Sequence, residues 1–328
     1  MGYLLGTDEA GYGPNLGPLV ISATVWEAPD KVRGEKLFDR LRHVVAPSLT
    51  ALAAAAESLD RSPCLAMADS KQLYSSGKGL KHLERGVLAA LGLLGQQPRT
   101  WRDVWCALAP DAGEILARTP WYTDFDLPLP VDCDGGELES LVATLAAGLA
   151  AAGVRLVAMR SRVVFAEDFN GLIEMHGNKG ETLSRATLAL ASQIIEPLSA
   201  GPISVICDKH GGRNMYADLL SEFFPEPLIE IHGESRERST YRFGPDPRRI
   251  QFCFRTRAEA CLPVALASMA SKYLRELAMR AFNDFWTKRV PDLQPTAGYP
   301  TDAKRFRADI AIVQKRLKIE DRILWRVR

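Results

Sequence analysis

The sequence of 328 residues is poor in cysteine, with six in all, and none of them forms a CxxC pair or follows a regular spacing. Structural zinc sites and disulfide frameworks both need cysteines at characteristic spacings. Three of these cysteines lie in apolar stretches that are typical of a protein core. The cysteines therefore argue against a structural zinc site and favour a reducing compartment.

The sequence also lacks an apolar run long enough to cross a bilayer, because its most apolar stretches are short or interrupted by polar residues. Its first residues have neither the basic segment nor the apolar run of a signal peptide. We therefore expect no membrane span and a cytoplasmic location.

An excess of charge of either sign is missing as well, since 41 Lys and Arg face 40 Asp and Glu, for a net charge of +1. Overall charge thus gives no sign of a nucleic-acid partner. Basic side chains nevertheless concentrate in residues 236–257 and 304–328. Each segment either binds phosphates or forms a solvated face, and the sequence leaves both interpretations open.

What the sequence does contain is a succession of apolar strand and helix patterns. Strands are expected at 2–8, 17–26, 154–165 and 203–208, with shorter ones within 226–255, and helices at 31–60, 77–95, 136–152, 179–197, 213–222, 263–285 and 301–317. Residues 96–135 contain several prolines and are expected to be irregular. This order predicts an α/β fold with a mixed central sheet flanked by helices, in a single domain over residues 1–328.

Two adjacent acids, Asp8 and Glu9, end the first apolar strand, just before a turn rich in glycine. A dinucleotide-binding loop is a poor match, because the glycines are spaced GxGxxxG and a strand follows where a helix is needed. A plain surface turn explains the glycines but not the acids. Buried carboxylates need a cation or a hydrogen-bond partner, and a metal ion would supply one.

Three other acids are candidates for such a site. Asp208 ends a second buried strand, Asp69 precedes a helix, and Glu276 lies within the long helix. Asp69 or Ser70 has an alternative role as a helix N-cap, and Glu276 as the ion-pair partner of Lys272 one turn earlier. Spacing alone does not bring these acids together.

Several segments, taken in order, resemble those of type 2 ribonucleases H, the ribonuclease HII family. They are residues 8–14 with 16–18, 69–73 (similar to DSKKL), 178–195, 205–208, 267–276 (similar to ASIIAKVTRD) and 298–301 (similar to GYGT or GYPT). Each motif is short, but the ordered set spans most of the chain.

This resemblance implies a ribonuclease H-like fold in which Asp8, Glu9, Asp208 and Glu276 surround two Mg²⁺ or Mn²⁺ ions. It implies an endoribonuclease that cuts the RNA strand of RNA/DNA hybrids, or ribonucleotides embedded in duplex DNA. Two-metal hydrolysis of the phosphodiester would leave a 5′-phosphate and a 3′-hydroxyl. No obligate protein partner is implied.

The resemblance also implies the residues that bind the substrate. Lys71 would contact a phosphate near the cut, Tyr299 would pack on the neighbouring sugar, and the backbone of Gly11, Tyr12 and Gly13 would read the ribose 2′-hydroxyl. One alternative is a nuclease with a changed substrate, and another is a non-catalytic nucleic-acid-binding protein of the same fold. Four acids argue against the latter, since binding alone needs basic side chains.

The sequence departs from the family pattern at several places. Tyr12 replaces the basic residue between the glycines, Glu276 replaces an aspartate, and Lys304 stands where histidine is usual. Type 3 ribonucleases H also lack that basic residue, and residues 254–259 resemble a segment of theirs. Residues 40–65, 96–135 and 211–258 are expected insertions, and residues 210–214 form either an added phosphate-binding loop or a glycine-rich turn before a helix.

Overall fold

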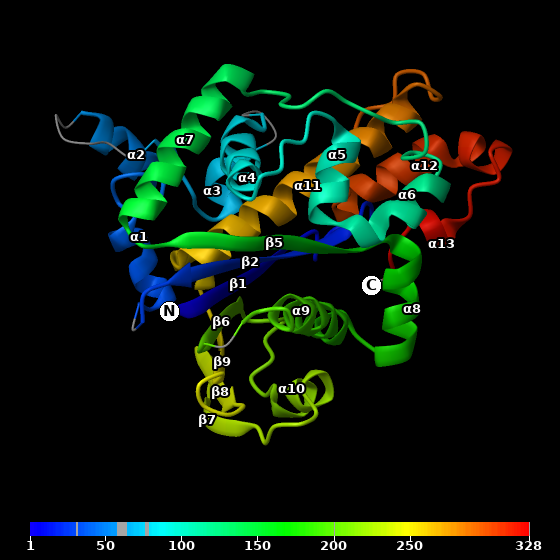
Figure 1. Cartoon of the computed structure of the whole chain (residues 1–328). Coiled ribbons are helices and arrows are strands. Elements are labelled where there is room, and N and C mark those ends of the chain that lie inside the picture. Colours follow the sequence, from blue (N-terminus) through cyan, green and yellow to red (C-terminus); the bar gives the residue numbers. More distant parts are fainter. Residues whose placement is uncertain (31, 58–63, 76–78, 200, 328) are drawn as a thin grey trace.

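The protein folds around one seven-stranded sheet with helices on both faces (Figure 1). The computed structural model describes residues 1–30, 32–57, 64–75, 79–199 and 201–327. The strand order is β5-β2-β1-β6-β9-β8-β7, and it combines parallel with antiparallel pairs. The predicted α/β fold with a mixed central sheet flanked by helices is therefore confirmed.

The elements follow in this order along the chain. The strands are β1 (Gly2–Ala10), β2 (Leu19–Ala28), β3 (Val45–Ala46), β4 (Leu65–Ala66), β5 (Arg155–Val164), β6 (Ile203–Asp208), β7 (Glu230–Glu234), β8 (Arg238–Phe243) and β9 (Ile250–Arg255), of which β3 and β4 form a small separate sheet. The helices are α1 (Leu37–Arg40), α2 (Leu49–Ala56), α3 (Ser70–Leu73), α4 (Lys81–Leu93), α5 (Trp101–Leu108), α6 (Gly113–Arg118), α7 (Gly135–Ala151), α8 (Ala166–His176), α9 (Lys179–Ile195), α10 (Ala217–Phe223), α11 (Leu262–Thr287), α12 (Pro300–Arg316) and α13 (Asp321–Leu324). Helices α4, α5, α7 and α11 lie on one side of the sheet and α9 and α10 on the other (Figure 1).

The centre of the sheet sets strands from distant parts of the chain side by side. β1 pairs with β2 in antiparallel and with β6 in parallel, and Thr7 lies beside Cys207 in that second pairing. β6 is in turn parallel with β9. Parallel strands end at the same edge of a sheet, where ligands of α/β proteins commonly bind, so the carboxyl ends of β1, β6 and β9 lie together there.

The long helix α11 packs on β1 so closely that the strand needs a residue without a side chain. A Cβ added at Gly6 would lie 2.3 Å from backbone atoms of Pro263 and Val264. Thr24 on β2 donates a hydrogen bond to the Pro263 carbonyl at 2.7 Å, which ties the start of the helix to the sheet. The first turn of α11 tolerates the proline because an N–H there would have no partner within the helix.

The structure departs from the predicted elements in two segments. Residues 31–60, expected to be one helix, contain α1, β3 and α2, while residues 31 and 58–60 lie outside the described residues. Residues 96–135, expected to be irregular, contain α5 and α6. Trp101 and Trp105 of α5 are buried, and Trp101 stacks with Tyr122 at 5.9 Å between ring centroids. Aromatic packing thus orders a segment that has no clear periodic pattern.

The six cysteines are free thiols, and Cys207, Cys253 and Cys261 are buried. In the part of the chain that the structure describes, no helix is both long and apolar enough to cross a membrane. The single-domain division and the three insertions stay predictions.

We expect Gly6→Ala to destabilise the protein by roughly 2–3 kcal/mol, because the backbone of α11 must move to admit the added methyl group. Chemical denaturation followed by tryptophan fluorescence measures the change. Gly113→Ala is the matched control, since nothing lies within 4 Å of a Cβ at that helical position. Equal stability of the two variants would refute the proposed importance of the close contact.

Candidate functional site

Three acids lie at the edge of the sheet where β1 and β6 end. Asp8 and Glu9 lie near the end of β1, and Asp208 is the last residue of β6. The parallel pairing of the two strands runs up to the residues just before Asp8 and Asp208, so these two acids follow at adjacent positions. Their charges affect one another. The structure therefore brings these three predicted residues together.

The surroundings of the three carboxyl groups disfavour their charged forms. Burial raises the pKa of Asp8 well above its usual value, and the neighbouring charge of Glu9 raises it further. Burial, and then the charge of Asp208, raise the pKa of Glu9 to about 7, although Lys71 opposes this. The pKa of Asp208 is raised as well, mainly by burial. Bound divalent cations relieve this kind of repulsion between buried acids.

One oxygen of Asp208, Oδ1, is buried and has no hydrogen-bond partner within the described residues. Such an oxygen is costly unless a donor or a cation meets it. Over residues 1–327, with the gaps given above, no three His, Cys, Asp or Glu side chains converge as a ready ligand set. Mg²⁺, however, is usually held by one or two carboxylates, with waters and substrate phosphates around it. The strand-end acids therefore fit a hard divalent cation.

Lys71 lies beside these acids, exposed on the short helix α3. Asp69 caps that helix by accepting a hydrogen bond from the Lys71 N–H at 3.1 Å, so its alternative role as an N-cap is confirmed. Ser268 of α11 accepts from the Ser70 N–H at 3.2 Å and ties the same turn to the long helix. The charge of Asp69, followed by the strand-end acids, raises the pKa of Lys71, so this side chain stays cationic.

Glu276 lies apart from the three strand-end acids. Its carboxylate accepts hydrogen bonds from the Tyr74 hydroxyl at 2.7 Å and from Lys272 Nζ at 2.5 Å, so the expected ion pair with Lys272 is present. Ser268, whose hydroxyl lowers the pKa of Asp8 through a hydrogen bond, precedes Glu276 on α11 by two turns, or roughly 12 Å along the axis. The structure does not bring Glu276 into the cluster.

A different acid, Glu259, lies near the cluster in a short 3₁₀ turn (Ala258–Ala260) that follows β9. Its charge raises the pKa of both Asp208 and Lys71. The sequence placed Glu259 in the segment that resembles type 3 ribonucleases H, but assigned it no role. The sequence does not show that β9 pairs with β6, and only this pairing places the turn after β9 beside Asp208.

The loop between β1 and β2 takes its shape from glycine. Gly11 and Gly17 have φ angles of 91° and 79°, and a Cβ added at Gly11 would lie 2.5 Å from the Pro18 carbonyl. Tyr12 is half-buried and packs against the core on the α9 side of the sheet. A Cβ added at Gly211 would lie 3.0 Å from its hydroxyl. The residue that replaces the expected basic side chain therefore packs onto the protein.

Tyr299 offers an exposed ring beside the same loop. It is 55% exposed and directly precedes α12, and a Cβ added at Gly13 would lie 3.9 Å from its ring. An aromatic ring of this kind can pack on a sugar or a base. Tyr299 is the N-cap residue of α12, and Thr301 lies within its first turn.

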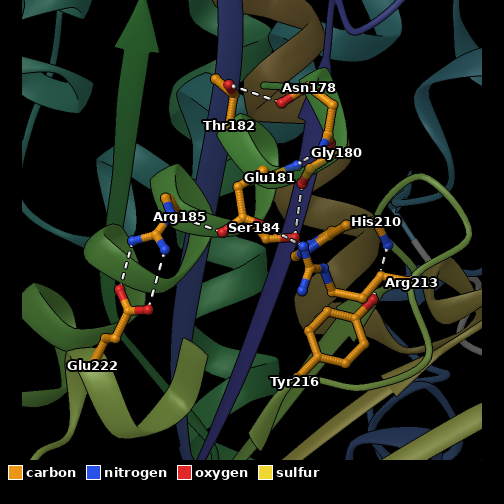
Figure 2. Close-up of polar contacts among 10 residues, drawn as sticks. All are labelled: Asn178, Gly180, Glu181, Thr182, Ser184, Arg185, His210, Arg213, Tyr216 and Glu222. Atoms are coloured by element: carbon orange, nitrogen blue, oxygen red, sulfur yellow. Dashed lines mark hydrogen bonds and ion pairs between the residues drawn. The ribbon is translucent and has the colours of Figure 1, made fainter. Parts of the chain in front are cut away.

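The chain that follows Asp208 is fastened to helix α9 (Figure 2). Arg213 forms an ion pair with Glu181, and His210 Nδ1 lies 3.2 Å from the Ser184 hydroxyl. Burial lowers the pKa of His210 to about 3, so its ring is neutral. These internal contacts support the structural-turn alternative for residues 210–214, and they hold the end of β6 in place.

The two basic segments have different surroundings. Four arginines of the first segment line a cavity of about 820 Å³ beside β8 and β9: Arg238, Arg242, Arg249 and Arg255. By contrast, Arg326 of the second segment is fully buried, and its Nη2 donates to the Gly11 carbonyl at 2.6 Å. At Arg326, the prediction of a solvated or phosphate-binding face is therefore wrong.

Comparison with known proteins gives one match among curated sequences. The chain is 25% identical over 154 residues to a ribonuclease HII of Albidiferax ferrireducens, which covers 37% of this chain and 72% of that protein. The chain is a distant relative of ribonuclease HII. No family model matches the sequence. The predicted resemblance is thus confirmed as a distant relationship.

Solved structures of similar proteins overlap with nearly the whole chain at low identity. Ribonuclease H2 from Pyrococcus horikoshii OT3 has a TM-score of 0.43 at 15% identity, covering 98% of this chain and 92% of that one. The PCNA:RNase HII complex from Archaeoglobus fulgidus gives 0.41 at 13%, covering 99% and 94%. Bst-RNase HIII in complex with Mn²⁺ gives 0.40 at 13%, covering 99% and 66%.

We expect Glu9→Gln to raise the melting temperature at pH 8 in EDTA. The folded-state pKa of about 7 lies above the usual 4.5, so ionisation of Glu9 makes the fold less stable as the pH rises from about 4.5 to about 7, and the loss persists above that. Each kcal/mol relieved corresponds to about 2–4 °C. Thermal scans at pH 5 and pH 8 measure the difference.

Glu139→Gln is the control, because Glu139 is an exposed residue of α7. Its melting temperature should follow that of the parent protein at both pH values. A Glu9→Gln variant that melts below the parent at pH 8 would show that this carboxylate is stabilised by its surroundings, contrary to our reading of the site.

Proposed function

We propose that the protein is a metal-dependent endoribonuclease that cuts RNA within RNA/DNA hybrids or at ribonucleotides embedded in duplex DNA. The observation that carries the proposal is the cluster of Asp8, Glu9 and Asp208 at two adjacent strand ends, with an unpaired buried oxygen on Asp208. A cluster of this kind disfavours folding unless a cation joins it. The choice of reaction follows from the ordered resemblance to ribonuclease HII.

Mg²⁺ or Mn²⁺ is the proposed cofactor, in two ions held by Asp8, Glu9 and Asp208, with a fourth acid that is Glu276 by sequence resemblance and Glu259 by position near Asp208. When bound, the ions would supply positive charge against the charge that develops on the phosphodiester. Oxygen ligands suit hard cations of this class. The similar Bst-RNase HIII was solved in complex with Mn²⁺.

The other residues would bind and orient the substrate. Lys71 is exposed and cationic beside the acids, as contact with a phosphate near the cut requires. Backbone N–H groups of the Gly11–Gly13 turn would meet the ribose 2′-hydroxyl, the group that separates RNA from DNA. Tyr299 would pack its exposed ring on the neighbouring sugar.

A non-catalytic protein of the same fold is the second candidate. It gains nothing from carboxyl groups whose pKa values are raised by burial and by one another. Negative charge at the site would also repel phosphates unless metal ions neutralised it. The raised pKa values therefore favour a metal-dependent enzyme over a protein that only binds.

Cleavage of three labelled duplexes in Mg²⁺ and in Mn²⁺ tests the proposal. One duplex carries a single ribonucleotide in DNA, the second is an RNA/DNA hybrid, and the third is all DNA. We expect metal-dependent cutting of the first two, leaving a 5′-phosphate, and loss of at least 10³-fold in Asp8→Asn, because one of the central charges that hold the ions is removed.

The melting temperature of Asp8→Asn, measured without metal, separates a catalytic loss from a folding defect. Relief of buried repulsion should leave this variant as stable as the parent or more so. Cutting of the hybrid alone would point to a type 3-like preference. A folded parent protein that cuts no duplex in either metal would refute the proposed activity.

For the fourth acid, the sequence and the geometry point to different residues. Glu276 holds the place of the family's fourth acid, whereas Glu259 is the acid whose charge reaches Asp208. We expect Glu259→Gln to lower cleavage about 10²-fold and to weaken Mn²⁺ binding, because its charge acts on Asp208. Glu276→Gln should cost less than tenfold, since Tyr74 and Lys272 hold its carboxylate apart from the other acids. The reverse order would assign the role to Glu276, as the sequence resemblance implies.

A further inference from the structure

The segment after α13 lies against the glycine-rich loop on one side and helix α8 on the other. Asn170 of α8 donates to the Trp325 carbonyl at 2.9 Å and accepts from the Val327 N–H at 2.8 Å. The guanidinium of Arg326 lies 4.7 Å from the centroid of the Phe169 ring. Helix α8 thus holds this segment in an extended form, with Arg326 directed inward.

Arg326 is bonded to the loop through both its backbone and its side chain. Its N–H donates to the Asn15 carbonyl at 2.9 Å, and the Asn15 side-chain amide donates to the Arg326 carbonyl at 2.9 Å. Its Nη2 donates to the carbonyls of Gly11, at 2.6 Å, and of Pro14. Asn15 and Arg326 are 3% and 0% exposed, so water does not compete for these bonds.

Packing alone does not explain a buried arginine at this place. Nε and Nη1 of Arg326 are buried and find no partner within the described part of the chain. Burial, and the nearby charge of Arg275, lower the pKa of Arg326 to about 9. A buried cation with unsatisfied donors is costly. Violations of this kind tend to occur where function requires them.

The contacts of Arg326 determine which way the loop peptides face. In a trans peptide, the carbonyl and the N–H point in opposite directions. The Pro14–Asn15 peptide shows the arrangement, because the Pro14 carbonyl faces Arg326 while the Asn15 N–H donates on the other side to the Gly298 carbonyl at 2.8 Å. Arg326 therefore lies on one side of the loop and Gly298 on the other.

The Gly11–Tyr12 peptide has the same orientation. The Gly11 carbonyl faces Arg326, so the Tyr12 N–H points away from it. No acceptor for the Tyr12 N–H is found among the residues that the structure describes. The side opposite Arg326 is also the side of Gly298, whose neighbour Tyr299 has an exposed ring.

We propose that Arg326 is a positioning residue that holds the Gly11–Tyr12 peptide with its N–H directed at the ribose 2′-hydroxyl of the substrate. This inference rests on the proposed function for its substrate. In this arrangement the cation, Arg326, lies behind the loop, whereas the family pattern has a basic side chain within the loop. Discrimination between RNA and DNA then depends on a contact 315 residues away in sequence from Gly11.

Arg326→Met tests the proposal, because it keeps much of the side-chain volume and removes every side-chain donor. Arg322→Met is the matched control in the same part of the chain, where Arg322 is 62% exposed and pairs with Glu167 and Glu320. Both changes are made in the parent protein for cleavage and in an Asp8→Asn background for binding. Fluorescence anisotropy compares a duplex with one ribonucleotide and the same duplex in DNA alone.

We expect Arg326→Met to reduce the preference for the ribonucleotide duplex at least tenfold, and Arg322→Met to leave it within twofold. Tenfold corresponds to about 1.4 kcal/mol, the scale of one hydrogen bond. Hydrogen exchange of the amides of residues 11–16 should accelerate in Arg326→Met alone. The kcat for bound ribonucleotide substrate should change less than KM, since the acids are untouched.

Three results would overturn the inference: an unchanged preference, an equal weakening for both duplexes, or unchanged exchange of the loop. A parent protein that cuts no duplex refutes the proposed function instead, which distinguishes the two failures. If Arg326→Met does not fold, Arg326→Lys replaces it, because lysine keeps one charged donor but lacks the forked guanidinium. Arg326→Lys should lose at least threefold in preference, and full retention would overturn the inference.

Discussion

Thr7 lies beside Cys207 in the parallel ladder of β1 and β6, and the properties of the site follow from that pairing. The ladder brings Asp8 and Asp208, which are 200 residues apart in the sequence, to one edge of the sheet. Gly6 lets α11 approach the same strand, and the helix then contributes Ser268 beside Asp8. A slip of one residue in β1 would turn Asp8 to the opposite face, because neighbouring residues of a strand face opposite sides.

The same geometry makes the site lower the stability of the folded state. Asp8, Glu9 and Asp208 all have raised pKa values, mainly because they are buried. Arg326 adds a buried cation with two unpaired donor atoms. The extensive apolar core on both faces of the sheet offsets these terms. Ligand binding would then stabilise the protein, since a cation removes the repulsion that folding imposes.

The parts that the sequence revealed are those that local pattern encodes. An apolar strand that ends in Asp8 and Glu9, and another that ends in Asp208, were visible because burial and strand ends leave a signal within a few residues. The aromatic layer around Trp101 was missed, although Thr100 and Asp103 form a capping box at the start of its helix. Its order depends on rings that meet only in the folded chain.

Long-range contacts account for the other differences. Glu259 reaches the acids because β9 pairs with β6, and Tyr12 packs on the α9 side, where a Cβ at Gly211 would lie 3.0 Å from its hydroxyl. Arg326 lies in a stretch of basic residues, where nothing local separates one buried arginine from its exposed neighbours. Charge patterns predict which face of a helix or strand is exposed to solvent, but they do not predict which single side chain enters the interior.

The separation of Arg326 from the loop that it holds has a consequence for biosynthesis. A ribosome makes the loop first and its anchor 315 residues later, so the acids and glycines leave the tunnel with the Gly11 carbonyl still unpaired. Contacts between such distant residues form late in folding, after the local helices and hairpins. A partly made chain would therefore carry the charged groups of the site without the geometry that directs them at a nucleic acid.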